Sequence, residues 1–149
     1  MKKYIIMAII LLFAVTAFGE NYPDGYKAHK WLTNKKQMTT LKQCEVFRDA
    51  TIGCTSEEKW KGYNVRVLYL FHSESFIGVV ISFRSLEGDS LKELSDKIIN
   101  DFGTPIHFND IYFFWNKNGT RVEWYYMKNE MYILHNDTIV RFLAKQKHE

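Results

Sequence analysis

Residues 63–83, YNVRVLYLFHSESFIGVVISF, restrict the fold more than any other stretch of the chain. Two runs of β-branched and aromatic residues flank a polar segment at residues 72–75, which is the pattern of a β-hairpin. Alternation puts apolar residues on both faces of these strands: Val65, Val67, Tyr69 and Phe71 on one, and Leu68 and Leu70 on the other. Such strands are typical of the middle of a sheet, so we expect further strands on either side.

The clearest helix is predicted at residues 90–101. Ser90 and Glu93 match a capping box at its start. Gly103 stands where a C-terminal glycine belongs, and Pro105 prevents continuation. The apolar stripe at helical spacing consists of Leu91, Leu94 and Ile98. This stripe predicts one helix packed on a sheet.

A three-strand meander is predicted at residues 111–134. Asn118-Gly119 indicates a two-residue type I′ turn, and Lys128-Asn129 is the expected second turn. The first turn fixes a register with three pairs on the core side: Trp115 with Val122, Phe113 with Trp124, and Ile111 with Tyr126. Alternation then places Tyr112, Phe114, Tyr125 and Met127 on the opposite face.

The remaining segments complete a predicted α+β fold. Residues 32–43 suit a short helix, with Thr33 or Asn34 as its cap and Met38 and Leu41 at helical spacing. Residues 44–50 suit a strand and residues 51–62 a polar loop. A short terminal helix, capped by Asp137, or a final strand would use Ile139, Val140, Phe142 and Leu143. We therefore expect a two-layer domain in the order α-βββ-α-βββ, with an antiparallel sheet of about six strands in two three-strand meanders.

The N-terminal residues 1–19 have the three parts of a secretory signal peptide. Lys2 and Lys3 precede an uncharged run from Tyr4 to Phe18, and small residues close the segment. The run is shorter than the roughly 20 residues of a spanning helix, although a retained membrane anchor is the alternative. Cleavage after Gly19 would leave residues 20–149 as a single exported domain, either periplasmic or secreted.

Charge and cysteines agree with export. The chain has 20 basic and 17 acidic residues, and removal of the signal segment with its two lysines leaves a net charge of +1. This near-neutral domain is not suited to nucleic acid, and any membrane contact would come from an uncleaved signal segment. Cys44 and Cys54 are the only cysteines. An even count without a C-x-x-C element predicts a structural disulfide in an oxidising compartment.

The sequence contains none of the motifs that mark common catalytic or cofactor sites. Phosphate-binding and dinucleotide-binding glycine loops are missing, as are the zinc-protease and hydrolase motifs. The five histidines, His29, His72, His107, His135 and His148, never come within four residues of one another. His107 is the best candidate among them, because Asp110 is near. We therefore expect no catalytic residue, no metal and no cofactor.

Several of these residues together resemble a group of small exported bacterial α+β proteins. The residues that carry the resemblance are Leu94, Phe102-Gly103-x-Pro105, Trp115, Tyr69-x-Phe71, Ile77, Val80 and Phe83. Members of the group have a helix ending in L…(Y/F)-G-x-P, followed by a meander that opens on a tryptophan. The match covers about residues 60–135. It implies a fold and lends no catalytic residue, since the group is largely without assigned activity.

The sequence favours a non-enzymatic binding domain that contacts another envelope or secreted protein. Its candidate partner surface lies on the outer side of the C-terminal meander and consists of Tyr112, Phe114, Arg121, Tyr125 and Met127. Tyrosine and arginine side by side are enriched at protein interfaces. A terminal segment that covers this face is the alternative. A small enzyme with scattered histidines and carboxylates, or a structural envelope component, would also fit the composition.

Export and oxidation are expected together. Mass spectrometry of the exported protein should show an N-terminus near Glu20 and a mass two hydrogens below that of the dithiol form. The physical reason is that signal peptidase and the oxidising compartment act on the same chain. Two alkylatable thiols in the native protein would contradict the disulfide.

Overall fold

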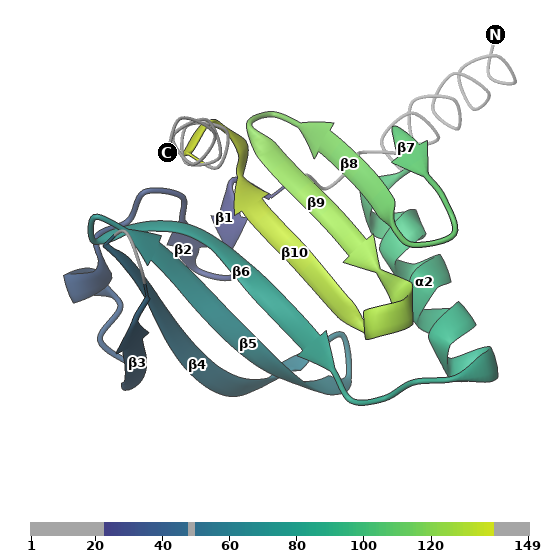
Figure 1. The fold of residues 1–149 in the computed structure, drawn as a ribbon, viewed down its shortest axis with the longest axis horizontal. Coiled ribbons are helices and arrows are strands. Elements are labelled where there is room, and N and C mark those ends of the chain that lie inside the picture. The colour runs from purple at the N-terminus through teal and green to yellow at the C-terminus, as the bar shows by residue number, and fades with distance from the viewer. Residues whose placement is uncertain (1–22, 48–49, 139–149) are drawn as a thin grey trace, which may run out of the picture.

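The protein is built around one large antiparallel sheet (Figure 1). Its structure, a computed structural model, describes residues 23–47 and 50–138. The strands of this sheet are β3 (Gln43–Val46), β4 (Thr51–Trp60), β5 (Tyr63–His72), β6 (Ser75–Phe83), β7 (His107–Phe108), β8 (Phe113–Lys117), β9 (Thr120–Tyr125) and β10 (Glu130–His135). Their spatial order is β3-β4-β5-β6-β10-β9-β8-β7. The remaining elements are β1 (Gly25–Tyr26), β2 (His29–Lys30), the 3₁₀ turns η1 (Lys35–Gln37) and η2 (Tyr126–Lys128), and the helix α2 (Gly88–Phe102).

The predicted two-layer α-βββ-α-βββ fold is wrong, because the described chain is mostly β. Of the helix predicted at residues 32–43, only the 3₁₀ turn η1 forms, where the Asn34 side chain accepts a hydrogen bond from the Lys36 amide at 2.9 Å. Met38 is buried in the core and Leu41 packs against it, but the segment makes these contacts without a continuous helix. The residues predicted as a polar loop form the ten-residue strand β4. The proposed terminal helix and the signal segment lie outside the described residues.

The strand order divides the sheet into two four-strand meanders. β3 to β6 form the first and β7 to β10 the second, and the last strands of the two, β6 and β10, pair antiparallel at the centre. The central register places Tyr132 opposite Val80 and Ile133 opposite Val79. The sheet therefore has the strand order of a pseudo-twofold repeat, with four strands per half where the sequence predicted three.

Two-residue turns connect three of the hairpins. Positive φ angles occur at Lys61-Gly62, Ser73-Glu74 and Asn118-Gly119, as tight turns with the right-handed twist of paired strands require. The predicted Asn118-Gly119 turn is confirmed, with Trp115 opposite Val122 and Phe113 opposite Trp124. The predicted hairpin of β5 and β6 also lies near the middle of the sheet.

Beyond these pairs, the predicted meander register is wrong. Ile111 precedes β8 and is 57% exposed, and Tyr126 begins η2 instead of continuing β9. The second turn is accordingly longer than Lys128-Asn129. It contains the whole of η2 and ends at Asn129 in the left-handed conformation, with φ of 55°.

The helix and the N-terminal segment cover the same face of the sheet. Leu94, Ile98 and Phe102 of α2 are buried, and in Figure 1 the helix lies behind the second meander. Trp31 of the N-terminal segment donates from Nε1 to Thr120 Oγ1 at 2.9 Å, and its ring lies 5.2 Å from that of Phe76. The core therefore lies on this inner face, and we call the opposite side of the sheet the outer face.

The predicted disulfide is present. Cys44 and Cys54 are bonded and lie directly opposite each other on β3 and β4, with a Cα–Cα distance of 4.0 Å. Cys54 is fully buried. The bond fixes the short edge strand β3 to β4, and it fits an oxidising, extracytoplasmic compartment.

Helix α2 starts earlier than the sequence predicted. Its N-cap is Glu87 and forms no side-chain capping bond, so the capping box of Ser90 and Glu93 is wrong. Gly103 does end the helix, with its amide donating to Ile99 O at 2.8 Å. The serine of α2 that makes a part-buried hydrogen bond to the sheet is Ser95, whose Oγ accepts from Trp124 Nε1 at 3.0 Å.

Ser95→Ala should destabilise the fold by about 1–3 kcal/mol, because it leaves the buried Trp124 N–H without its acceptor. Ser90→Ala is the matched control and should change the free energy of unfolding by less than about 0.5 kcal/mol, since Ser90 is exposed. Urea denaturation of both variants measures the difference. An equal loss of unfolding free energy in both variants would contradict this assignment and would support Ser90 as a capping residue.

Candidate functional site

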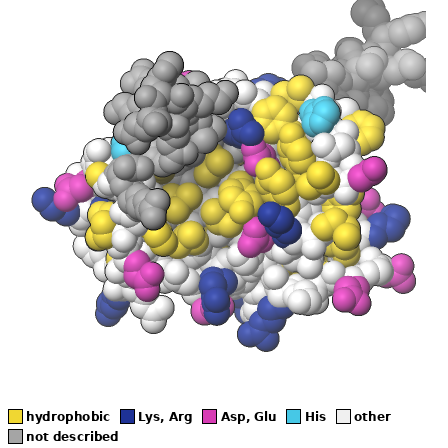
Figure 2. Space-filling model, viewed as in Figure 1, with side chains coloured by type: hydrophobic (Ala, Val, Ile, Leu, Met, Phe, Trp, Pro, Cys, Tyr) yellow, Lys and Arg dark blue, Asp and Glu magenta, His cyan; other side chains and the backbone are white. Residues whose placement is uncertain are grey.

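Three rows of side chains cross the outer face at right angles to the strands. Residues directly opposite each other in neighbouring strands share a face, so the registers define each row. The first row is Glu57, Arg66, Ser82, Glu130 and Tyr125. The second is Thr55, Leu68, Val80, Tyr132, Glu123 and Phe114, and the third is Gly53, Leu70, Gly78, Leu134, Arg121 and Asn116. Figure 2 shows this face, with apolar side chains gathered across the middle of the sheet among charged ones.

Tyrosines form a continuous cluster on the second meander. The ring of Tyr112 stacks on that of Tyr125, with centroids 5.1 Å apart and planes 19° apart. Tyr132 meets Tyr125 edge-on at 5.4 Å. The Tyr125 hydroxyl donates to Glu123 at 2.8 Å and the Tyr132 hydroxyl to Glu130 at 3.0 Å. These contacts hold the rings in place while each remains partly exposed.

An arginine and a glutamate lie beside this cluster. Arg121 forms an ion pair with Glu123, and its guanidinium carbon lies 4.9 Å from the centroid of the Phe114 ring, within cation–π range. Glu123 is only 6% exposed, and Arg121 and the hydroxyl of Tyr125 are the partners of its buried side chain.

The pKa values of two of these tyrosines are raised. Burial, followed by the hydrogen bond to Glu123 and its negative charge, raises the pKa of Tyr125 from 10.0 to about 12. Burial, followed by the hydrogen bond to Glu130 and that charge, raises the pKa of Tyr132 to about 12. Both hydroxyls therefore act as hydrogen-bond donors throughout the neutral range.

The structure brings together most of the predicted partner surface. Tyr112, Phe114, Arg121 and Tyr125 lie together on the outer face. Met127 is 73% exposed but lies in η2, beyond the end of β9, because the chain leaves the sheet after Tyr125. The described part of the N-terminal segment, which begins at residue 23, packs on the inner face and does not cover this cluster. Residues 1–22 and 139–149 lie outside the described part of the chain.

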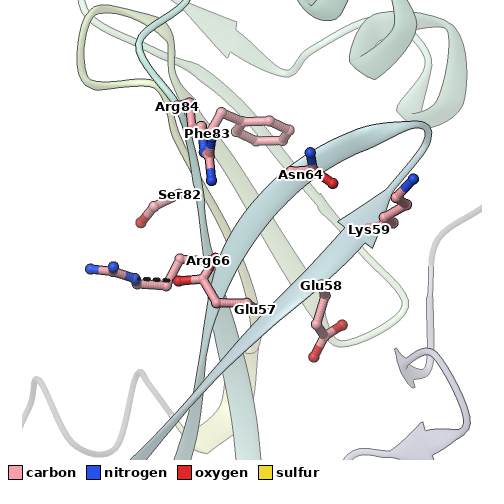
Figure 3. A pocket seen from close by; sticks show the side chains of 8 residues that line it. All are labelled: Glu57, Glu58, Lys59, Asn64, Arg66, Ser82, Phe83 and Arg84. Carbon is pink, nitrogen blue, oxygen red and sulfur yellow. Dashed lines mark hydrogen bonds and ion pairs between the residues drawn. The ribbon is translucent and has the colours of Figure 1, made fainter.

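Sequence reasoning missed the contribution of the first meander to this face. A hollow of about 670 Å³ lies at the end of β4, β5 and β6 near the Lys61-Gly62 turn (Figure 3). Its lining residues are Glu57, Glu58, Lys59, Asn64, Arg66, Ser82, Phe83 and Arg84. The signal that could have found it is the pair of polar residues at alternate positions on each side of the Lys61-Gly62 turn, Glu57 and Lys59 before it and Asn64 and Arg66 after it. The interpretation of residues 51–62 as a polar loop concealed this pattern.

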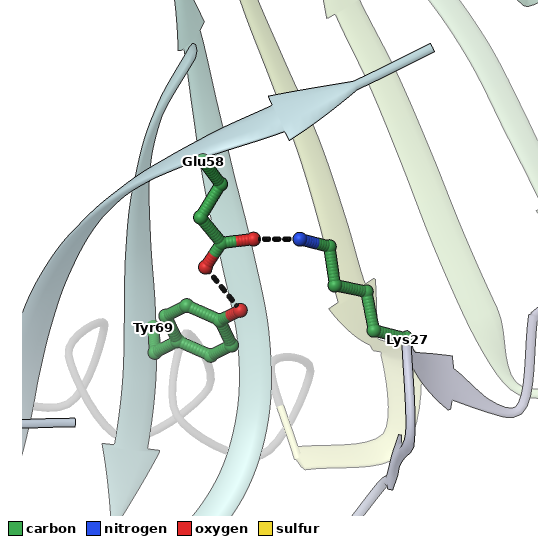
Figure 4. A network of polar contacts seen from close by, with 3 residues as sticks. All are labelled: Lys27, Glu58 and Tyr69. Carbon is green, nitrogen blue, oxygen red and sulfur yellow. Dashed lines mark hydrogen bonds and ion pairs between the residues drawn. The ribbon is translucent and has the colours of Figure 1, made fainter. Parts of the chain in front are cut away.

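A second polar cluster lies on the inner face and joins the N-terminal segment to the sheet (Figure 4). Glu58 forms an ion pair with Lys27 and accepts a hydrogen bond from the Tyr69 hydroxyl at 2.6 Å. Burial and the Glu58 charge raise the pKa values of Tyr26 and Tyr69 well above their ordinary value. Because Glu58 is occupied by these two partners, we interpret the cluster as a structural anchor.

The histidines are dispersed over the fold. His29, His72, His107 and His135 belong to β2, β5, β7 and β10. His107 lies beside Tyr112, with ring centroids 5.9 Å apart. Within residues 23–47 and 50–138, no three histidine, cysteine, aspartate or glutamate side chains are grouped so that they could hold a metal ion. The expectation of a protein without metal or cofactor stays a prediction.

Comparison with protein-family models, curated proteins and solved structures finds no significant match. The resemblance to small exported bacterial proteins therefore remains untested. Among the described residues, no helix is long and apolar enough to cross a membrane.

Stability should fall as the pH rises from 10 to 12. The folded-state pKa values of Tyr125 and Tyr132 lie above that of an unfolded tyrosine, so their contribution is complete below pH 10 and is lost as the pH approaches 12. Replacing both with phenylalanine should make the loss shallower, although Tyr26 and Tyr69 still contribute. Urea midpoints at pH 8, 10 and 11 measure the slope, and an unchanged slope would contradict this assignment.

Proposed function

We propose that the protein is an exported, non-enzymatic binding domain of the bacterial envelope or secretome, which recognises another protein through its outer face. The observation that carries the proposal is the partly exposed tyrosine cluster of Tyr112, Tyr125 and Tyr132. Within residues 23–47 and 50–138, α2 and the N-terminal segment cover the other face of the sheet. Tyrosine and arginine supply much of the binding energy at protein interfaces. The cluster has both, since Arg121 lies in the neighbouring row.

The geometry supports binding because the aromatic rings are held before a partner arrives. Tyr125 is stacked on Tyr112 and bonded to Glu123, and Tyr132 is bonded to Glu130. Side chains that are already ordered lose less rotational entropy on association. Partly exposed apolar side chains also continue onto the first meander through Leu68 and Val80, and a contiguous apolar surface of this kind typically marks a contact site.

Site-specific photo-crosslinking tests the location of the partner. A photoreactive phenylalanine analogue in place of Tyr112 or Tyr132, both partly exposed members of the cluster, should capture the same partner in intact cells. The matched control is the analogue at Lys92, on the exposed side of α2, behind the sheet. Equal capture of that partner at Lys92 would contradict the outer face as the site.

The double variant Tyr112→Ser with Tyr125→Ser should keep its melting temperature within a few degrees and lose the captured partner. Both rings are partly exposed, so their loss removes contact area while the inner core remains intact. Lys92→Ser with Asp96→Ser is the matched control and should retain the partner. A sharp fall in melting temperature of the tyrosine variant would show that the rings serve as core and would end the interface proposal.

A further inference from the structure

The first row of the outer face connects the hollow with the tyrosine cluster. Arg66 lies opposite Ser82, Ser82 opposite Glu130, and Glu130 opposite Tyr125. Three strand spacings separate Arg66 from Tyr125, a distance of about 14 Å at about 4.8 Å per strand. A single extended segment of about four to five residues covers this span, so one partner segment reaches both places.

The hollow presents an excess of positive charge on the outer face. Glu58 is turned to the inner face, where it pairs with Lys27 (Figure 4). Glu57 is the remaining carboxylate and pairs with Arg66 at 3.0 Å. Lys59 and Arg84 are exposed, and neither forms an ion pair with any residue in the described ranges. Among the residues that line the hollow, three cationic side chains and one carboxylate therefore face outward.

The lining of the hollow also supplies the hydrogen-bond donors that a carboxylate needs. An arginine guanidinium binds a carboxylate through two parallel hydrogen bonds, and Arg84 is available for this because Arg66 is held by Glu57. Asn64 and Ser82 add neutral donors to the same hollow. Figure 3 shows Arg66, Ser82 and Arg84 grouped on one side of the strands.

We propose that this hollow accepts an aspartate or glutamate side chain from an extended acidic segment of the partner protein, with Arg84 as the principal contact. The inference rests on the proposed function, because the apolar end of the same segment lies on Tyr112 and Tyr125. Arg84 directly follows β6, one strand nearer to Tyr125 than Arg66 is, so the recognised segment carries an acidic residue about three to five residues from an aromatic or aliphatic one.

The probe is a displayed library of random 12-residue peptides selected on the immobilised mature protein. Enriched peptides should favour aspartate and glutamate over lysine and arginine, with an apolar residue at the stated spacing. Their affinity should fall about tenfold or more in Arg84→Glu and should decrease with added salt. Arg84→Lys should retain part of the affinity, because the positive charge remains while the paired geometry is lost.

A matched charge control separates the hollow from the net charge of the protein. Lys92→Glu makes the same change of charge on the exposed side of α2 and should leave the affinity unchanged. An equal loss in Lys92→Glu and Arg84→Glu would overturn the proposal, because overall charge would then explain the selection. Circular dichroism of each variant confirms that the fold is retained.

The remaining outcomes distinguish this proposal from the broader one. Peptides that are not acidic, but lose affinity in Tyr112→Ser with Tyr125→Ser, would overturn the acidic segment and leave the outer face as a binding surface. Enriched peptides that are unaffected by both the tyrosine and the arginine variants would overturn both proposals. A selection without any enriched peptide would likewise count against both, because an extended segment is the proposed ligand.

Discussion

The pairing of β6 with β10 is the constraint on which the rest of the structure depends. It joins two four-strand meanders into one sheet, although the two strands are distant in the sequence. On the inner face the joint is crossed by aromatic packing, since the ring centroids of Phe83 and Trp124 lie 5.5 Å apart. On the outer face the same pairing aligns Val80 with Tyr132. Both the core and the candidate binding surface therefore depend on one register.

The sequence predicted features that are decided by neighbouring residues. The Asn118-Gly119 turn needs positive φ at both positions, and the pair supplies it locally. The end of α2 at Gly103 has a local signal of the same kind. Strand β4 could not be predicted in this way, because charged residues such as Glu57 and Lys59 are also typical of a surface loop. Only pairing with β5 places these two side chains on the outer face of a sheet. The four-plus-four order depends on long-range pairing that no local pattern encodes.

The candidate site shows the same division. The alternation of side chains along the two strands that flank the Asn118-Gly119 turn was sufficient to place Tyr112, Phe114 and Tyr125 on a common face. It failed at Met127, since the chain turns into η2 instead of continuing the strand. The hollow with Arg84 required the alignment of β4, β5 and β6, which only the assembled sheet provides. Sequence reasoning therefore found the aromatic half of the outer face and missed its basic half.

The position of β10 at the centre of the sheet determines the order in which the chain can assemble. The ribosome completes β6 long before β10, so one side of β6 remains unpaired while the second half of the chain is made. An unpaired strand of apolar residues is a template for pairing with other chains. Residues 75–83 are therefore the segment that must be kept from pairing with other chains until β10 is in place. Among the described strands, the last to be synthesised is thus also the one that covers the open side of β6.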